Sequence, residues 1–123
     1  MATITSHVLD SVKGTHAAGI RIACFRRDET GTTTLLFDKK ANEQGRIQEA
    51  IDISNTGESN EIELVFAAAE YFKSLTQSDT HGQIMDTVVI RLTLNDSEGS
   101  YHVPVMLSPH SYSVWWSDSP KPA

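Results

Sequence analysis

The sequence contains a single cysteine, Cys24, among 123 residues, so no disulfide can form within the chain. Cys24 lies in an apolar segment, which favours a small buried hydrophobic side chain over a nucleophile. No apolar run approaches the length of a transmembrane helix, and no basic segment followed by an apolar run marks a signal peptide. Residues 119–123 (SPKPA) are not an obvious peroxisomal address. A cytoplasmic protein is therefore the default expectation.

Positive charge is also scarce. Ten lysine and arginine residues against 16 aspartate and glutamate residues give a formal net charge of −6. This balance argues against nucleic acid and anionic membrane surfaces as partners, although one arginine can still dominate a pocket for a small anion. Hydrophobic residues make up 39% of the chain and charged residues 21%, which suits a folded core. We expect a single domain over residues 1–123, with a flexible tail from about residue 117.

Helical patterns are rare, and alternation of apolar and polar residues dominates the chain. Only residues 67–75 (AAAEYFKSL) have the apolar spacing and the alanine content of a short helix. Strands are expected at residues 3–10, 19–27, 33–38, 47–53, 61–66, 86–94, 101–107 and 112–116. Many short strands separated by polar turns, with one helix, predict an all-β sandwich of two sheets.

The alternation is clearest over residues 101–107 (YHVPVML). Tyr101 and Val103 fall on one face of an extended strand, whereas His102, Pro104 and Met106 fall on the other. The second face is apolar apart from one titratable group, so we expect something other than bulk water to cover it. The pattern resumes at residues 112–116, which predicts an antiparallel hairpin with a turn around residues 109–111.

Three side chains could carry chemistry. They are His7 on the first strand, Arg46 at the start of a short strand, and His102. A neutral histidine suits a general base near pH 7, and an arginine can hold a planar anion through two hydrogen bonds. The alternative is two unrelated sheet histidines and a surface arginine. His16 and His81 lie in polar loops and are expected to be solvated.

Several short motifs resemble those of the 5-hydroxyisourate hydrolases, the enzyme branch of the transthyretin family. The motifs are HVLD at 7–10, AAG at 17–19, NEQGR at 42–46, YHVP at 101–104 and SP at 108–109. They occur in the family's order, and the resemblance runs from about residue 4 to residue 115. Each motif is modest by itself, but their shared order is specific.

The resemblance implies a transthyretin-like two-sheet β-sandwich that assembles into a homotetramer, a dimer of dimers. A central channel in that tetramer would cover the face of His102. It also implies that His7, Arg46 and His102 open a small heterocyclic, purine-derived substrate by acid–base catalysis, without a metal or other cofactor. The transport branch of the family lacks all three residue types, which favours an enzyme. A peroxisomal location is open by the same analogy.

The C-terminal segment departs from the family pattern. The hydrolases typically end in Tyr-Arg-Gly-Ser, whereas this chain reads WWSD at residues 115–118 and continues for five more residues. Because this segment forms part of the pocket in the hydrolases, we expect Pro104, Ser113, Trp115 and Ser117 to contact the substrate. The indole of Trp115 would either narrow the channel and stack on the substrate, or pack in a subunit interface.

The changed tail leaves several functions open. The complete set of His7, Arg46 and His102 favours hydrolysis of 5-hydroxyisourate. The tail favours a repurposed enzyme that catalyses an isomerisation, cyclisation or elimination on another cyclic substrate. A carrier that binds a ligand in the channel is a non-enzymatic alternative. A zinc site formed by His7, His102 and His110 is the weakest alternative, because their spacing matches no ligand signature.

Overall fold

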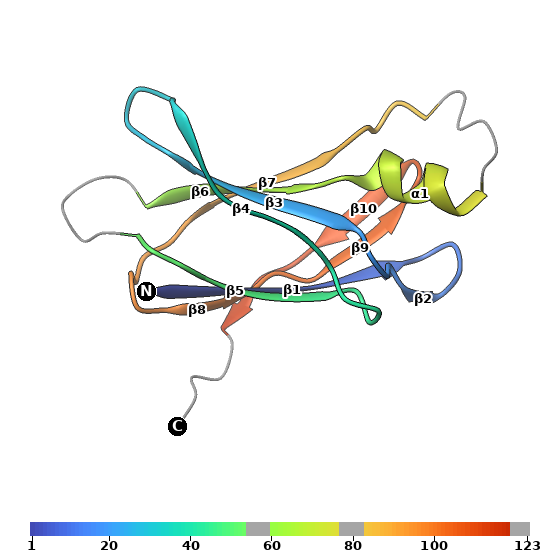
Figure 1. The fold of residues 1–123 in the computed structure, drawn as a ribbon, viewed down its shortest axis with the longest axis horizontal. Coiled ribbons are helices and arrows are strands. Elements are labelled where there is room, and N and C mark those ends of the chain that lie inside the picture. The colour runs from blue at the N-terminus through green and yellow to red at the C-terminus, as the bar shows by residue number, and fades with distance from the viewer. Residues whose placement is uncertain (54–59, 77–82, 119–123) are drawn as a thin grey trace.

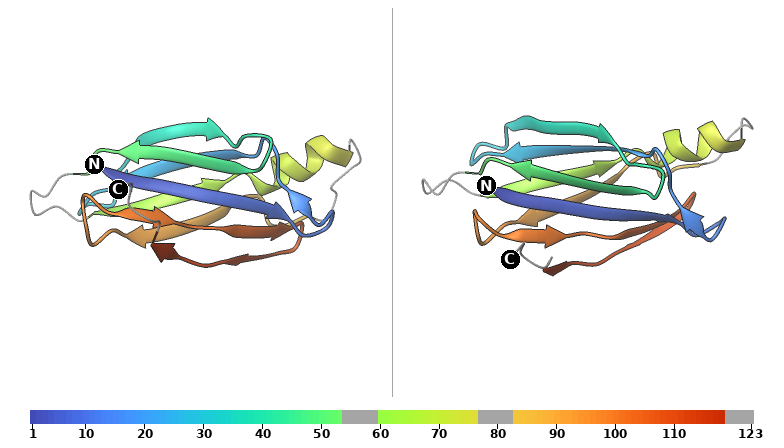
Figure 2. Two further views of the ribbon diagram at one scale, coloured as in Figure 1. Left: turned by 90° about the horizontal axis from the view of Figure 1, so that it is seen from below. Right: turned by 60° about the horizontal axis from the view of Figure 1, so that its bottom comes forward.

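The computed structural model describes residues 1–53, 60–76 and 83–118. Two stacked β-sheets make up most of this part of the chain, and one helix lies at one end of the stack (Figures 1 and 2). This arrangement confirms the predicted two-sheet sandwich with one short helix. The helix is α1 (Ala68–Thr76), and the strands are β1 (Ala2–Asp10), β2 (Thr15–His16), β3 (Arg21–Arg27), β4 (Thr33–Lys40), β5 (Arg46–Ile51), β6 (Glu61–Phe66), β7 (Val88–Thr93), β8 (Ser100–His102), β9 (Val105–Ser108), β10 (Ser111–Val114) and β11 (Ser117–Asp118). No helix in the described part of the chain is long and apolar enough to cross a membrane.

The first strand, β1, is the centre of the larger sheet. Along one edge it pairs antiparallel with β5, and its last two residues pair with β2. Along the other edge, β8 and β9 both run parallel to β1, one beside its first half and the other beside its second half. β11 and β10 then extend the sheet beyond β8 and β9. The smaller sheet has the order β4-β3-β6-β7, with all neighbours antiparallel.

The single strand predicted over residues 101–107 is interrupted at Pro104, between β8 and β9. Proline has no N–H to donate to a neighbouring strand. Beside it, the N–H of Val103 donates to the Thr5 carbonyl at 2.9 Å, and the carbonyl of Val103 accepts from the buried Ser6 hydroxyl at 2.6 Å. The serine hydroxyl therefore supplies a hydrogen bond where the strand ladder is broken. The predicted core face survives the break, since its members are all buried: Tyr101, Val103, Val105 and Leu107.

The other predicted strands are present, with shifted ends. β3 begins at Arg21, β4 continues to Lys40, and β10 ends at Val114. β2 and β11 were not predicted, because two residues carry no alternation and are recognised only by their pairing with β1 and β8. Residues 117 and 118 therefore lie in a strand, at the point where we expected the tail to begin.

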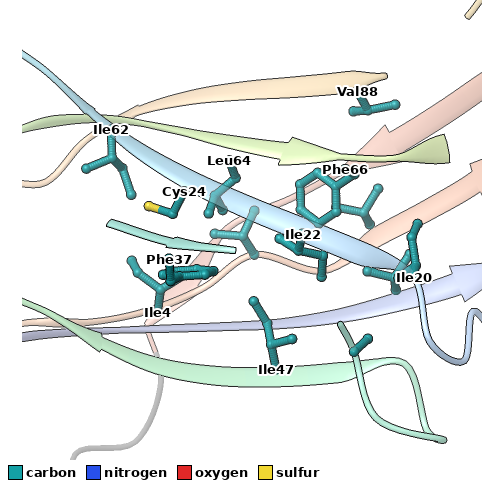
Figure 3. Packing of buried hydrophobic residues seen from close by; sticks show 14 of the residues in the cluster. Ile4, Ile20, Ile22, Cys24, Phe37, Ile47, Ile62, Leu64, Phe66 and Val88 are labelled. Atoms are coloured by element: carbon teal, nitrogen blue, oxygen red, sulfur yellow. The ribbon is translucent and has the colours of Figure 1, made fainter. Parts of the chain in front are cut away.

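The core lies between the two sheets (Figure 3). Alternate side chains of β1, β3 and β6 fill it, including Ile4, Val8, Ile22, Cys24, Leu64 and Phe66, all with 0% of their surface exposed. Burial raises the pKa of the Cys24 thiol to about 12, so this side chain remains an uncharged thiol at neutral pH. The predicted role of Cys24 as a small buried hydrophobic residue is confirmed.

A buried hydrogen bond joins α1 to the end of β1. The hydroxyl of Tyr71 donates to Oδ2 of Asp10 at 2.8 Å, and Asp10 is only 1% exposed. Oδ1 of Asp10 accepts from the backbone N–H groups of Val12 and Lys13 at 2.9 and 3.1 Å. Burial, then the bond to Asp10 and its charge, raise the pKa of Tyr71, so its hydroxyl stays protonated as a donor. The helix and the aspartate thus fix the turn that leads into β2 and His16.

Candidate active site

The outward face of the larger sheet collects the three side chains that the sequence singled out. Alternate residues of β1 are buried, so Thr5 and His7 lie on the face away from the core and are half-buried. His7 lies directly opposite Arg46 in the pairing of β1 with β5, and Thr5 lies directly opposite His102 in the pairing with β8. Directly opposite residues project to the same face of a sheet. Three strands that are distant in the sequence but adjacent in space, β5, β1 and β8, therefore bring His7, Arg46 and His102 together (Figure 1).

A tight turn before β5 positions Arg46. Oδ1 of Asn42 accepts from the backbone N–H groups of Gln44 and Arg46 at 2.9 and 3.0 Å, and the N–H of Asn42 donates to the Arg46 carbonyl at 3.0 Å. Gly45 has a φ of 70°, which favours glycine, and its carbonyl accepts from the N–H of Val8 at 2.8 Å. No side chain of the described residues forms an ion pair with Arg46. The exposed guanidinium is therefore available to an anion.

The ring of His102 is held by a threonine that the sequence analysis did not single out. Oγ1 of Thr5 lies 2.8 Å from Nδ1 of His102, and the same hydroxyl donates to the Tyr101 carbonyl at 3.4 Å. We assign the proton of the neutral ring to Nδ1, because the threonine oxygen can then accept from it while its own proton goes to the carbonyl. Nε2 of His102 then carries the lone pair. Thr5 shares its face with His7, but only the β1–β8 pairing reveals its contact with His102.

Both histidines are biased towards the neutral form. Burial is the largest cause of the lowered pKa of His7. The charges of Arg46, His16 and His102 lower this pKa further. Burial and then the charge of Arg46 lower the pKa of His102. Each ring therefore stays neutral to a pH below its ordinary pKa of 6.5. At neutral pH both rings can accept a proton.

His16, which we expected to be solvated, is exposed but also bonded to His7. Its Nδ1 lies 2.9 Å from Nε2 of His7, and the ring centroids are 5.1 Å apart. The contact arises because β2 folds back on β1, placing His16 opposite Leu9, two residues beyond His7 on the same face. The sequence offered no signal for this pair, because a two-residue strand cannot be recognised without its partner.

The four residues expected to contact a substrate lie in different environments. Ser117 is half-buried and lies directly opposite His102 in the pairing of β11 with β8. Pro104 is buried within the chain, and its carbonyl accepts from the N–H of Trp115 at 3.3 Å. Pro104 therefore needs no cover from another molecule, in contrast to our expectation for this face. Ser113 and Trp115 are exposed on the surface of the single chain.

In the described part of the chain, no group of three histidine, cysteine, aspartate or glutamate side chains could hold a metal ion. The alternative of a zinc site at His7, His102 and His110 therefore finds no support among these residues. His81, which we expected to be solvated, lies outside the described residues.

Comparison with known proteins shows the family directly. Residues 4–116 match the model of the HIUase/Transthyretin family. The chain belongs to this family. A 5-hydroxyisourate hydrolase from Deinococcus radiodurans is 34% identical over 113 residues, which cover 91% of this chain and 92% of the relative. Another from Mesorhizobium japonicum is 35% identical over 112 residues, covering 91% of this chain and 89% of the relative. These matches confirm the resemblance to the hydrolase branch and the expectation of an enzyme.

A solved structure of (S)-allantoin synthase has the same fold. It superimposes with a TM-score of 0.78 at 27% sequence identity, and the match covers 95% of this chain. The match covers only 44% of the synthase chain, so this chain corresponds to less than half of that protein. A probable 5-hydroxyisourate hydrolase of Schizosaccharomyces pombe, 28% identical, covers 91% of this chain and 88% of the relative. The family thus includes relatives close in length to this chain.

Proposed function

We propose that this chain is a 5-hydroxyisourate hydrolase-like enzyme that opens a purine-derived ring by acid–base catalysis with His7, Arg46 and His102. One observation carries the proposal: three separate strands bring to one face two histidines with lowered pKa values and an arginine that has no ion-pair partner among the described residues. Two side chains that exchange protons and one that holds negative charge are what the opening of a cyclic amide requires.

In the proposed reaction, Arg46 holds the oxygen on which negative charge develops as water adds to the ring carbonyl. One histidine takes a proton from that water, and the oxygen bonds to the carbonyl carbon. The carbon–nitrogen bond then breaks, and the other histidine, after taking up a proton from solvent, gives that proton to the departing nitrogen. The step consumes one water and changes no oxidation state, so it needs no redox cofactor.

Freshly prepared 5-hydroxyisourate should decay much faster in the presence of the protein than in its absence. The decay is followed spectrophotometrically, and a parallel sample with heat-denatured protein controls for uncatalysed decay. The physical reason is that histidines in the neutral form can accept the proton of water at neutral pH, and that an exposed guanidinium can stabilise the developing negative charge; both lower the activation barrier. Unchanged decay at protein concentrations in the micromolar range would overturn the proposed hydrolase activity.

A second candidate, a repurposed enzyme acting on another cyclic substrate, is favoured by the tail. Trp115 and Trp116 are 48% and 54% exposed, where the hydrolases usually carry a tyrosine and an arginine. An indole offers an apolar plane and a single donor, whereas an arginine offers a cation and five donors. A less polar substrate would gain from this exchange. Absence of action on 5-hydroxyisourate, with the site intact, would promote this candidate over hydrolysis.

We also propose that the enzyme is a homotetramer formed as a dimer of dimers. Apolar side chains of β9, β10 and the segment after them are unusually exposed in the single chain: Met106, Tyr112, Val114, Trp115 and Trp116, each between 37% and 54%. Met106 lies opposite Ser113, whereas Tyr112 and Val114 lie opposite the buried Leu107 and Val105, so exposed apolar side chains occur on both faces of this edge. Their exposure favours burial against another copy. Sedimentation at micromolar concentration should give the mass of four chains, and a monomer there would contradict the assembly.

A further inference from the structure

The pairing of β2 with β1 places a second histidine against His7. Nδ1 of His16 and Nε2 of His7 are 2.9 Å apart, which is a hydrogen-bond distance, and the two rings are tilted by 37°. His7 is half-buried, whereas His16 is exposed. Nε2 of His7 is therefore already bonded to a more exposed imidazole.

A backbone contact of His7 decides which ring carries the shared proton. A backbone hydrogen bond with Gln44 raises the pKa of His7, as a carbonyl acceptor does, since it stabilises the protonated ring. Because Nε2 faces His16, we assign this bond to Nδ1, and with it the proton of the neutral ring. Nε2 of His7 then has only a lone pair, and the proton between the rings belongs to Nδ1 of His16. This leaves the lone pair of His16 on Nε2.

We propose that His7 and His16 act together as one general base, with His16 taking the proton at its exposed Nε2 and passing its Nδ1 proton to His7. This proposal rests on the proposed hydrolytic function and specifies the group that activates the water. It assigns His16, which no family motif singled out, to the reaction. His102 is then left for the departing nitrogen, but its neutral ring carries a lone pair on Nε2, so it must first take up a proton from solvent at Nε2 and then give that proton to the nitrogen.

The transfer balances within the two rings. Water loses a proton to Nε2 of His16, the proton on Nδ1 of His16 moves to Nε2 of His7, and the hydroxide equivalent adds to the carbonyl carbon. His16 ends neutral, with its proton on the other nitrogen, and the positive charge ends on His7. The backbone hydrogen bond with Gln44 favours that charge, since it raises the pKa of His7. Three charged or titratable groups on neighbouring strands act on His7: Arg46 of β5, His16 of β2 and His102 of β8. All three disfavour a positive charge on His7, so the protonated ring should give its proton back readily.

Two substitutions separate proton relay from simple positioning. His16→Ala removes the donor to His7, whereas His16→Asn keeps an N–H donor near the position of Nδ1 but cannot take up a proton and pass it on. If His16 relays the proton, both variants should lower kcat by about 10–100-fold with KM changed less than about twofold, since general-base catalysis contributes about 10²–10⁴-fold. His110→Ala, at an exposed turn, is the control and should keep wild-type kcat.

The pH profile gives a second kinetic readout. The lowered pKa of His7 should keep the acid limb of kcat/KM below pH 6.5, because the neutral base persists until the pH falls through that pKa. His16→Ala removes one of the causes that lower the pKa, so the limb should move to higher pH. Recovery of wild-type kcat in His16→Asn would overturn the relay and leave His16 as a positioning residue. Wild-type kcat in His16→Ala would remove it from the reaction.

An activity-independent measurement separates failure of this inference from failure of the proposed function. Long-range ¹H–¹⁵N NMR correlations on the wild-type protein should show both His7 and His16 protonated on Nδ1 at neutral pH. A proton on Nε2 of His7 would overturn the relay, whatever the substrate proves to be. A wild-type protein inactive on 5-hydroxyisourate but with both rings protonated on Nδ1 would overturn the hydrolase function alone, and leave the paired base for another substrate.

Discussion

Replacing His102 by glutamine should lower kcat/KM for ring opening by about 10²–10⁴-fold, the range typical of a lost acid–base group. Glutamine keeps an amide that can bond to Oγ1 of Thr5, but it cannot take up or release a proton near neutral pH. Because His102 is half-buried on the outward face, the substitution should leave the core untouched. Steady-state kinetics on 5-hydroxyisourate, with the unfolding midpoint measured alongside, tests this expectation.

A matched variant separates the loss of the proton-transfer group from the loss of its support. Thr5→Val keeps the shape of the side chain and removes only the hydroxyl bonded to Nδ1 of His102. It should retain more activity than His102→Gln, because the imidazole remains and loses only its fixed orientation. Near-wild-type turnover in His102→Gln, with the protein folded, would take His102 out of the mechanism.

Gly45→Ala should destabilise the protein by about 3 kcal/mol or more and reduce activity by separating Arg46 from His7. Gly45 has a φ of 70°, and a Cβ there would overlap the carbonyl oxygen of Val8 and lie 3.2 Å from the nitrogen of Ala17. Both neighbours are backbone atoms, so they cannot make room by a change of rotamer. The start of β5 would therefore have to move away from β1, at the point where Arg46 and His7 face one another.

Gly14→Ala is the matched control for this substitution. Gly14 has the same φ of 70°, but a Cβ added there would meet nothing within 4 Å. The control should therefore lose only the unfolding free energy that an alanine costs at positive φ, about 1–2 kcal/mol, and should keep its activity. Equal losses of unfolding free energy in the two variants, measured by denaturant unfolding, would show that the close approach of β5 to β1 contributes nothing.

The sequence alone identified the fold because alternation is a local property. Residues 3–10 and 61–66 alternate strictly, and the structure places strands there with the expected side chains buried. Ala68, Tyr71 and Phe72 have helical spacing and lie on the buried side of α1, although Leu75, the fourth residue in that pattern, is 39% exposed. Each pattern specifies which side of an element faces the core, which is enough to predict two packed sheets.

Alternation failed where a contact from another segment decided the local structure. It predicted one strand across Pro104, but proline cannot donate to a strand ladder, and the Ser6 hydroxyl of β1 satisfies the Val103 carbonyl instead. It also predicted a strand to residue 116, whereas β10 ends at Val114 and β11 then pairs with β8. Short strands of this kind form only by pairing with another strand, and their own residues show no alternation that would predict them.

The candidate site divides in the same way. The sequence determined that His7, Arg46 and His102 are present within motifs of one family, and that His7 and His102 lie on outward faces of their strands. Only the tertiary structure decided that β5 and β8 flank β1 in the register that sets Arg46 opposite His7 and His102 opposite Thr5. It also decided that His16 bonds to His7 and that Ser117 lies opposite His102. The physical reason is that strand register depends on hydrogen bonds between segments distant in sequence, which no local pattern of side chains encodes.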